Sequence, residues 1–353
     1  MVGVDLFCGA GGMSLGAVQA GIKVVLAVDD DRHAVATYSA NHPLTTVVVS
    51  DIRCLTRHRL RQLLSRRRVD VVFGGPPCQG FSYSNLRTRS TENSENWLFR
   101  EFLRVVRLLQ PPWVLFENVR GLVNTASGVF FRQVTSGLRR AGYAISYAVP
   151  NARHFGVPQD RARLFICGSR KGTEIRLPTA SRRRSVTVRE AIQDLPALGV
   201  GANVDWMEYG PVPPSRYGRT LRNGQPGCPN HLVSVNSRRV LARYAHIPQG
   251  GNWEDIPPRL MRNYEDRTRC HTGIYHRLRE DEPSIVIGNY RKNMLIHPTQ
   301  DRGLSVREAA RLQSFPDSYV FHGSFGFQQQ QVGNAVPPQL AYYVFRSLIR
   351  QAS

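Results

Sequence analysis

The sequence predicts an α/β fold with a parallel sheet and a smaller, loop-rich second domain. Short apolar, β-branched runs alternate with helical patterns over residues 1–178, an alternation typical of parallel sheets covered by helices. Over residues 179–300 proline and glycine become dense and periodicity fades, which favours loops. Helical spacing returns in residues 301–353, and we expect this segment to pack back on the first domain.

Each element follows from its own local pattern. Runs of β-branched and apolar residues predict strands over residues 2–7, 24–28, 45–49, 69–73, 113–116, 143–149 and 164–167. Apolar residues at helical spacing predict helices over residues 13–20, 34–41, 56–68, 98–109, 130–141, 305–314 and 338–349. The helix over 56–68 is rich in arginine, so we expect it to be exposed.

The composition indicates a globular protein that binds a polyanion. Hydrophobic residues make up 41% and charged residues 21% of the 353 residues, which excludes a disordered chain. The formal net charge is +21, and the positive excess occurs in every part of the chain. Phosphate contacts dominate nucleic-acid affinity, so the charge favours a nucleic-acid partner. Nearly all of the basic residues are arginine, a bias that can also reflect genomic base composition.

The cysteine spacing and the N-terminal sequence indicate the cellular compartment of the protein. Six cysteines lie far apart, without a C-x-x-C pair or a spacing that fits zinc, so we predict no metal site. The chain runs directly into an apolar strand without a basic leader, and no run approaches membrane-span length. We therefore expect a reduced, cytoplasmic protein.

The first two strands predict a site for an adenosine cofactor. Glycines Gly9 and Gly11 follow the first strand and precede a helix, which brings backbone close to a ligand. Asp29 ends the second strand, where it can accept hydrogen bonds from ribose hydroxyls. A carboxylate at Asp51, followed by Ile52, could accept from an exocyclic adenine amine, and Phe7 could stack on the base. These features do not exclude NAD, and one of the acids next to Asp29 is explained by a helix N-cap.

The segment Phe73–Ser82 is the most informative stretch of the chain. A strand delivers Cys78 to the carboxyl end of the sheet, and two prolines fix the turn before its sulfur. A lone cysteine is most often an inert small hydrophobe. Cys78 instead follows a stiff polar turn, which predicts a thiolate nucleophile.

A glutamate and two arginines are candidates for the same edge of the sheet. Glu117 follows four apolar residues, so it is either a proton donor with a raised pKa or a carboxylate tied to an arginine such as Arg120 or Arg161. Arg161 and Arg163 fall on one face of a strand by period-two alternation. Together they could clamp a phosphate and an exocyclic oxygen, or merely alternate charge along an edge strand.

These residues, taken in order, resemble the DNA cytosine-5 methyltransferases of the prokaryotic restriction-modification type. The matching motifs are Asp5–Gly12, Gly75–Ser82, Phe116–Val119, Gln159-x-Arg161-x-Arg163, Arg307–Pro316 and Gln331–Pro338. The resemblance covers about residues 1–175 and 295–345. It implies a Rossmann-like S-adenosylmethionine-dependent methyltransferase sheet in residues 1–178, a target-recognition domain in 179–300 and a returning C-terminal segment in 301–353.

The resemblance implies a covalent mechanism. Cys78 would add to C6 of a flipped-out cytosine while Glu117 donates a hydrogen bond or proton to N3, and C5 would then accept the methyl group. Arg163, with Arg161, would hold the ring oxygen. The residues that would line the S-adenosylmethionine site are Phe7, Gly9, Gly11, Asp29, Asp51, Ile52, Pro77, Leu98, Asn334 and Val336. The family usually has glutamate where this chain has Asp29, so the ribose contacts are expected to be looser.

The resemblance also implies duplex DNA as the partner. Segment 82–95, with Ser82 and Ser84, resembles the family's mobile loop that closes over the flipped base. Arginines Arg219, Arg222, Arg267 and Arg269 are candidates for groove or phosphate contacts, and arginine favours guanine, which suggests a GC-rich site. We expect a monomer from a prokaryote or virus, with a restriction endonuclease acting on the same site.

Two alternatives remain open. A tRNA-methylating relative is disfavoured because Gln79–Ser82 has the DNA-enzyme form and no Cys-Phe-Thr tripeptide occurs. A DNA-binding protein with a decayed methylase fold is disfavoured because Cys78, Glu117, Arg161 and Arg163 are all present.

Overall fold

The computed structural model describes residues 1–77, 97–181, 184–264, 273–288, 290 and 294–352. They form two compact units: Met1–Phe155, Ala162–Arg182 and Val336–Ser353 make the first unit, and Gly156–Arg161 and Arg183–Ala335 make the second. These bounds differ from the predicted domains, because only Val336 onward, and not all of residues 301–353, belongs to the first unit.

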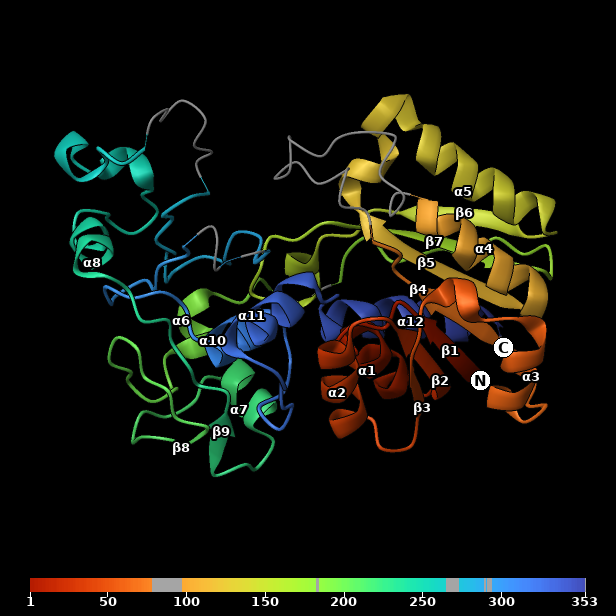
Figure 1. Cartoon of the computed structure of the whole chain (residues 1–353), viewed down its shortest axis with the longest axis horizontal. Coiled ribbons are helices and arrows are strands. Elements are labelled where there is room, and N and C mark those ends of the chain that lie inside the picture. Colours follow the sequence, from red (N-terminus) through yellow and green to blue (C-terminus); the bar gives the residue numbers. More distant parts are fainter. Residues whose placement is uncertain (78–96, 182–183, 265–272, 289, 291–293, 353) are drawn as a thin grey trace. The chain divides into compact units, whose positions relative to one another are not determined.

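The first unit contains a seven-stranded sheet with the order β3-β2-β1-β4-β5-β7-β6 (Figure 1). Its strands are β1 Val2–Leu6, β2 Lys23–Asp29, β3 Thr46–Val49, β4 Val71–Gly74, β5 Trp113–Val119, β6 Ala144–Ala148 and β7 Arg163–Ser169. The predicted parallel pairing is confirmed for β1 to β5. β7 is antiparallel to both β5 and β6, because only a 3₁₀ turn at Ala152–Phe155, and no crossover helix, joins β6 to β7.

Helices cover both faces of this sheet (Figure 1). Helices α3 Arg57–Leu64, α4 Leu98–Leu109 and α5 Val129–Arg140 pack their apolar sides on the face formed by residues such as Val72 and Phe116. Helices α1 Gly12–Gln19, α2 Arg32–Asn41 and α12 Pro338–Ala352 cover the other face, where Phe345 meets Phe73 edge-on at 4.9 Å between ring centroids. Over the part of the chain described, no helix has both the length and the apolar character needed to cross a membrane.

Helix α12 lies directly on α1, and a glycine makes the contact possible. A Cβ atom built on Gly16 would lie 2.5 Å from the Ala341 Cβ and 2.5 Å from the Pro338 carbonyl oxygen. No larger residue fits there without separating the helices. The predicted return of the C-terminal helix to the first unit thus depends on Gly16.

The second unit has few regular elements. They are α6 Val188–Ile192, β8 Trp206–Glu208, α7 Arg216–Arg222, β9 Gly227–Pro229, α8 Arg238–Tyr244, α10 Val306–Leu312 and α11 Phe325–Asn334, besides short 3₁₀ turns. Only α10 is predicted by the sequence pattern, because the other elements are too short or too polar to show a clear period.

Buried arginines replace regular backbone pairing in this unit. Arg277, for example, donates to the carbonyl oxygens of Ile247, Tyr244 and His297 at 2.6–2.9 Å. Loop carbonyls that lack a ladder partner must still be satisfied when buried, and one guanidinium offers five donors. The arginines buried in the second unit are Arg161, Arg243, Arg277, Arg302, Arg307 and Arg311.

Candidate functional site

The carboxyl ends of β1, β4 and β5 lie side by side at one edge of the sheet. Leu6 of β1 pairs with Gly74 of β4, which pairs with Phe116 of β5. Neighbouring strands are about 4.8 Å apart, so the segments that follow β1 and β5 leave the sheet about 10 Å from each other. Ligands of open α/β sheets bind at this edge.

The turn that follows β1 is left-handed and open. Phe7, Gly9 and Gly11 have φ angles of 61°, 50° and 86°, and Gly11 caps the N-terminus of α1. A Cβ atom built on Gly9 meets no heavy atom of the described residues within 4 Å. The backbone therefore borders free space that a bound group can fill, while Phe7 packs its partly buried ring against the core.

Asp29 is fixed beneath this turn by two backbone donors. Its Oδ2 accepts from the N–H of Gly9 at 2.8 Å and its Oδ1 from the N–H of Asp31 at 3.0 Å. Burial raises the pKa of the Asp29 carboxyl, and the two N–H donors oppose that rise. Each oxygen keeps a second lone pair for a ligand. Asp31 is the N-cap of α2, so the predicted capping role of one neighbouring acid is confirmed.

Asp51 and Ile52 lie after β3, as the sequence predicts. Asp51 caps the 3₁₀ turn Ile52–Cys54 by accepting from the N–H of Arg53 at 2.8 Å. It also faces the Arg53 Nη1 at 3.4 Å, and both side chains are about half exposed. Ile52 is buried, and its carbonyl oxygen accepts from the Arg104 Nη2 at 2.8 Å. Asp51 thus has a structural role of its own besides the predicted contact with adenine.

A second buried acid, Asp5, lies below the turn and is not among the predicted site residues. The Ser14 hydroxyl donates to the Asp5 Oδ2 at 2.6 Å, and the Tyr38 hydroxyl donates to the Ser14 Oγ at 2.7 Å. Burial raises the pKa of Asp5 well above its ordinary value. The sequence signal for it is an acid inside an apolar strand, a position that requires a buried partner. The chain of three side chains ties α1 and α2 to β1 under the turn.

The segment after β4 lies against β5. A Cβ atom on Gly74 would lie 1.9 Å from the carbonyl oxygen of Leu6, so only glycine fits. The Asn118 side-chain amide donates to the carbonyl oxygen of Pro76 at 3.0 Å. Pro77 is the last residue described before Cys78, which lies outside the described residues together with segment 82–95.

Glu117 and Arg163 form a shielded ion pair at this edge. The Arg163 Nε lies 3.2 Å from the Glu117 Oε1, and the side chains are 13% and 10% exposed. Burial lowers the pKa of Arg163, and the charge of Glu117 opposes that change. A Cβ atom on Gly75 would lie 2.5 Å from the Glu117 Oε2. The carboxylate therefore lies directly against the backbone that leads to Cys78, and Arg163 is an arginine partner that the sequence did not single out for it.

Arg161 has a different environment from Arg163. Strand β7 begins at Arg163, so Arg161 lies before the strand and in the second unit. Its guanidinium donates to the carbonyl oxygens of Ile287 at 2.8 Å, Gly333 at 2.9 Å and Ala335 at 3.0 Å. Period-two alternation does not extend to Arg161 because the chain there is a loop. Its observed contacts join three segments of the second unit.

The remaining predicted cofactor residues are spread over both units. Leu98 is the first residue of α4 and is partly buried, and Val336 is buried in the first unit. Asn334 is the exposed last residue of α11 in the second unit. Their roles stay predictions.

Of the four arginines predicted to contact DNA, two can be placed. Arg219 is exposed on α7. Arg222 donates from Nε to the Asp194 Oδ2 at 2.7 Å, and its guanidinium carbon lies 3.6 Å from the Tyr209 ring centroid. Arg222 is thus engaged within the second unit. Arg267 and Arg269 lie outside the described residues, as do Ser82 and Ser84.

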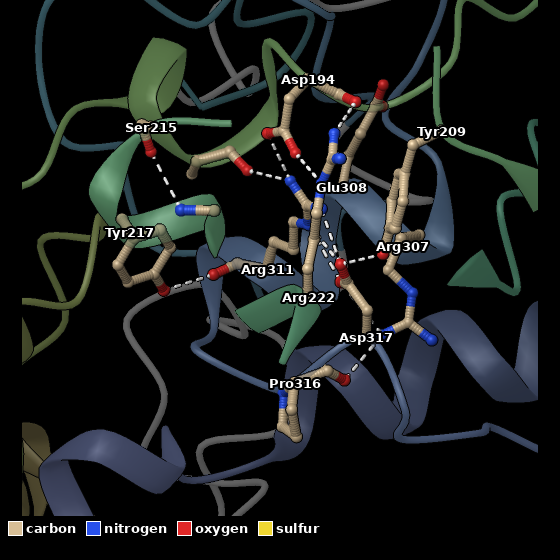
Figure 2. A network of polar contacts seen from close by, with 12 residues as sticks. Asp194, Tyr209, Ser215, Tyr217, Arg222, Arg307, Glu308, Arg311, Pro316 and Asp317 are labelled. Atoms are coloured by element: carbon tan, nitrogen blue, oxygen red, sulfur yellow. Dashed lines mark hydrogen bonds and ion pairs between the residues drawn. The ribbon is translucent and has the colours of Figure 1, made fainter. Parts of the chain in front are cut away.

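Arg222 belongs to a buried network centred on Arg311 (Figure 2). The Arg311 Nη2 lies 2.6 Å from the Asp317 Oδ2, and its Nη1 lies 2.7 Å from the Asp194 Oδ1. All three side chains are fully buried. Burial acts to lower the pKa of Arg311, but the two carboxylates outweigh it and raise that pKa. Part of the net positive charge is therefore used inside the second unit and not on its surface.

The whole chain matches one protein family. A family model described as C-5 cytosine-specific DNA methylase matches residues 1–350. The type II methyltransferase M1.HphI of Haemophilus parahaemolyticus is 38% identical over 349 residues, which cover 98% of this chain and 86% of that protein. The type II methyltransferase M.XorII of Xanthomonas oryzae pv. oryzae is 35% identical over 362 residues, with 96% and 82% covered.

Solved structures share the fold. The crystal structure of an Escherichia coli prophage protein described as a DNA modification methyltransferase has a TM-score of 0.81 and 27% identity, with 99% of each chain covered. The Entamoeba histolytica methyltransferase EhMeth has a TM-score of 0.64 at 13% identity, covering 100% of this chain and 99% of that one, and indicates the fold alone. The predicted α/β methyltransferase sheet is thereby confirmed.

Proposed function

The chain belongs to the C-5 cytosine-specific DNA methylases, and from that premise we propose that it methylates C5 of a cytosine flipped out of duplex DNA through a covalent bond between Cys78 and C6. The family and fold imply S-adenosylmethionine as the methyl donor, which supplies an electrophilic methyl group when bound. The observation that carries the proposal is the Glu117–Arg163 pair against Gly75, three residues before Cys78.

The chemistry of the ring assigns a task to each side chain. The Cys78 thiolate adds to C6, and the electron pair of the C5–C6 double bond makes C5 nucleophilic. Glu117 donates a hydrogen bond or proton to N3, and Arg163 donates to the exocyclic carbonyl oxygen of the ring, where negative charge develops during the addition. After C5 is methylated, its proton leaves to solvent, the bond to sulfur breaks and the double bond returns. In a stacked duplex C6 is out of reach, so the cytosine must flip, at a cost of a few kcal/mol.

The turn after β1 fits the cofactor. Gly9 borders open space, and Asp29 keeps free lone pairs beside it. We propose that Asp29 accepts from the ribose hydroxyls. We further propose that the other residues of this site are Phe7, Gly11, Asp51, Ile52, Pro77, Leu98, Asn334 and Val336.

Replacing Asp29 by asparagine should weaken S-adenosylmethionine binding by about 10- to 100-fold. The change removes hydrogen bonds to a charged acceptor, each worth about 1.5–3 kcal/mol. Isothermal titration calorimetry measures the dissociation constant. Asp30→Asn, one residue on and exposed, should leave it unchanged. Equal affinities for both variants would remove Asp29 from the site.

Replacing Gly75 by alanine should lower kcat for methyl transfer by about 100-fold, because a misplacement of about 1 Å in a catalytic group has that effect. The added methyl group would lie 2.5 Å from the Glu117 Oε2 and displace the carboxylate. Steady-state transfer of labelled methyl to DNA measures the change. Gly199→Ala adds the same methyl group where no heavy atom of the described residues lies within 4 Å, and it should retain full activity.

We propose that the enzyme is the modification half of a type II restriction-modification system with a cognate endonuclease, because its relatives M1.HphI and M.XorII are type II methyltransferases. The proposed DNA contacts are Arg219, Arg267, Arg269, Ser82 and Ser84. Labelled methyl offered to duplex DNA and to tRNA separately tests the substrate class. Transfer to tRNA alone would refute the DNA assignment. If duplex DNA is methylated, bisulfite sequencing of it identifies the recognition sequence.

A further inference from the structure

A cationic surface pocket lies at the sheet edge opposite the catalytic residues. It has a volume of about 610 Å³, and its charged lining residues are Arg67, Arg68, Arg170 and Lys171. Val69 precedes β4, Pro112 precedes β5 and Arg170 follows the antiparallel β7, which places the pocket at the amino ends of β4 and β5. Along β5, Pro112 and Glu117 are five residues apart, a distance of about 16 Å. We call this site the amino-edge pocket.

The four cations have no acidic partner in the described part of the chain. None of them forms an ion pair there, and the pocket lining contains no acid. The acid nearest in sequence, Asp70, uses its Oδ2 to accept from the N–H of Val2 at 2.7 Å. Among the described residues, therefore, no acidic side chain forms an ion pair with a cation of the pocket.

Three helix C-termini explain only part of this charge. Helix α3 ends at Leu64, α4 ends at Leu109, a lining residue, and α12 ends at Ala352, whose carbonyl oxygen accepts from Lys171. Each C-terminus presents about half a negative elementary charge, so together they offset about one and a half of the four positive charges. More than two remain, and like charges held close together are unfavourable without a counter-ion.

The pocket is partly preorganised. The Arg170 Nη1 donates to the carbonyl and side-chain oxygens of Gln110, both at 3.3 Å. The Lys171 Nζ donates to the carbonyl oxygen of Ala352 at 3.4 Å and lies 5.8 Å from the Trp113 ring centroid. These contacts hold two cations in place, while Arg67 and Arg68 are exposed and free to meet a ligand.

We propose that the amino-edge pocket binds the phosphate groups of a second duplex DNA segment, separate from the duplex that presents the cytosine. More than two uncompensated positive charges in an open pocket match a phosphodiester backbone, and each contact releases counter-ions. The apolar lining residues offer no donor or acceptor side chain for reading bases, and the Gln110 side-chain oxygen is already engaged by Arg170. We therefore expect phosphate contacts to dominate the binding. One chain can thereby hold two DNA segments at once. The inference relies on DNA as the substrate, not on the covalent mechanism.

A DNA-bridging assay tests this proposal. The full chain is bound to an immobilised duplex, and capture of a second, fluorescent duplex is measured between 50 and 200 mM salt. The double variant Arg67→Gln/Arg68→Gln should lose at least about nine-tenths of the capture at low salt, yet bind the first duplex and transfer methyl as before. For two phosphate contacts, the logarithm of the binding constant falls with the logarithm of the salt concentration with a slope of about −1.8. The ratio of the second-duplex affinity of the unaltered chain to that of the variant should therefore fall about 12-fold between 50 and 200 mM salt.

The controls separate the possible outcomes. Arg139→Gln/Arg140→Gln removes the same charge from two exposed arginines outside the pocket and should keep full capture. Cys78→Ser should also keep it, so a failed methylation mechanism is distinguishable from a failed second site. Undiminished capture by Arg67→Gln/Arg68→Gln would overturn the proposal. A second outcome would also overturn it: neither the unaltered chain nor Arg67→Gln/Arg68→Gln captures the second duplex, while the unaltered chain binds tripolyphosphate and the double variant does not. That outcome would assign the pocket to a free polyphosphate.

Discussion

Replacing Cys78 by serine is expected to lower methyl transfer to DNA by about 10⁴-fold or more. A serine hydroxyl is not ionised near neutral pH and has no strong base assigned to it here, so it cannot replace a thiolate as nucleophile. Loss of a nucleophile in other enzymes costs about 10⁶ in kcat. Single-turnover transfer of labelled methyl to duplex DNA measures the loss directly.

Two further measurements make this result specific. A duplex that carries 5-fluorocytosine should form a stable adduct with the unaltered chain, because the fluorine at C5 cannot leave as a proton does. Cys78→Ser should form no adduct but keep its affinity for DNA. Cys54→Ser is the matched control, since Cys54 is exposed and lies outside the proposed chemistry. Full turnover by Cys78→Ser would refute the covalent mechanism.

Replacing Arg311 by methionine is expected to destabilise the second unit by about 3–5 kcal/mol, the cost of leaving a buried charge without its partner. In this variant Asp194 would still form an ion pair with Arg222 at 2.7 Å. Among the described residues, the side-chain partners left to Asp317 would be Arg307 at 3.9 Å and the Tyr209 hydroxyl. Thermal unfolding followed by circular dichroism should show a fall in Tm of about 6–20 °C, at about 2–4 °C per kcal/mol.

The controls distinguish charge from side-chain volume. Arg219→Met makes the same replacement at an exposed position of the same unit and should leave Tm unchanged. Adding Asp317→Asn to Arg311→Met should recover part of the loss, because the uncompensated charge disappears. If Arg311→Met alone unfolds at the temperature of the unaltered protein, the network does not stabilise the unit.

The same pair predicts an acid limit for the unaltered protein. Burial acts to raise the pKa of Asp317, but its hydrogen bonds and the charge of Arg311 outweigh burial and hold that pKa below its ordinary value. A carboxyl with a lowered pKa in the folded state stabilises the protein fully above about pH 4, and this contribution is lost as pH falls through the folded-state pKa. The Tm difference between the unaltered protein and Arg311→Met should therefore shrink only below about pH 4.

The sequence was sufficient for the parts of the fold governed by local pattern. Helix α4 has its predicted bounds because Phe99, Phe102, Leu103 and Val106 repeat at helical spacing and are all buried. The position of Glu117 at the carboxyl edge followed from the apolar run before it, and Asp29 lies beneath the glycine turn as expected. In each case the deciding interactions involve near neighbours or adjacent strands.

Long-range contacts explain what the sequence could not predict. The sequence did not reveal that Arg161 and Arg222 bind groups of the protein itself, since arginine serves phosphate and buried carbonyl oxygens equally well. Their partners Gly333 and Asp194 are 172 and 28 residues away, and no local pattern links them. Asp5 was missed for the same reason, because Ser14 and Tyr38 reach it only in the folded chain.

The contact between Gly16 and Ala341 joins residues from nearly opposite ends of the chain. A ribosome adds about 5–20 residues per second, so α1 emerges many seconds before its cover, α12. During that interval α12 is not available to cover α1. The second unit, which ends at Ala335, is synthesised before α12. A message cut short before residue 336 would therefore yield a chain that contains all of the second unit but lacks α12, the helix that covers α1.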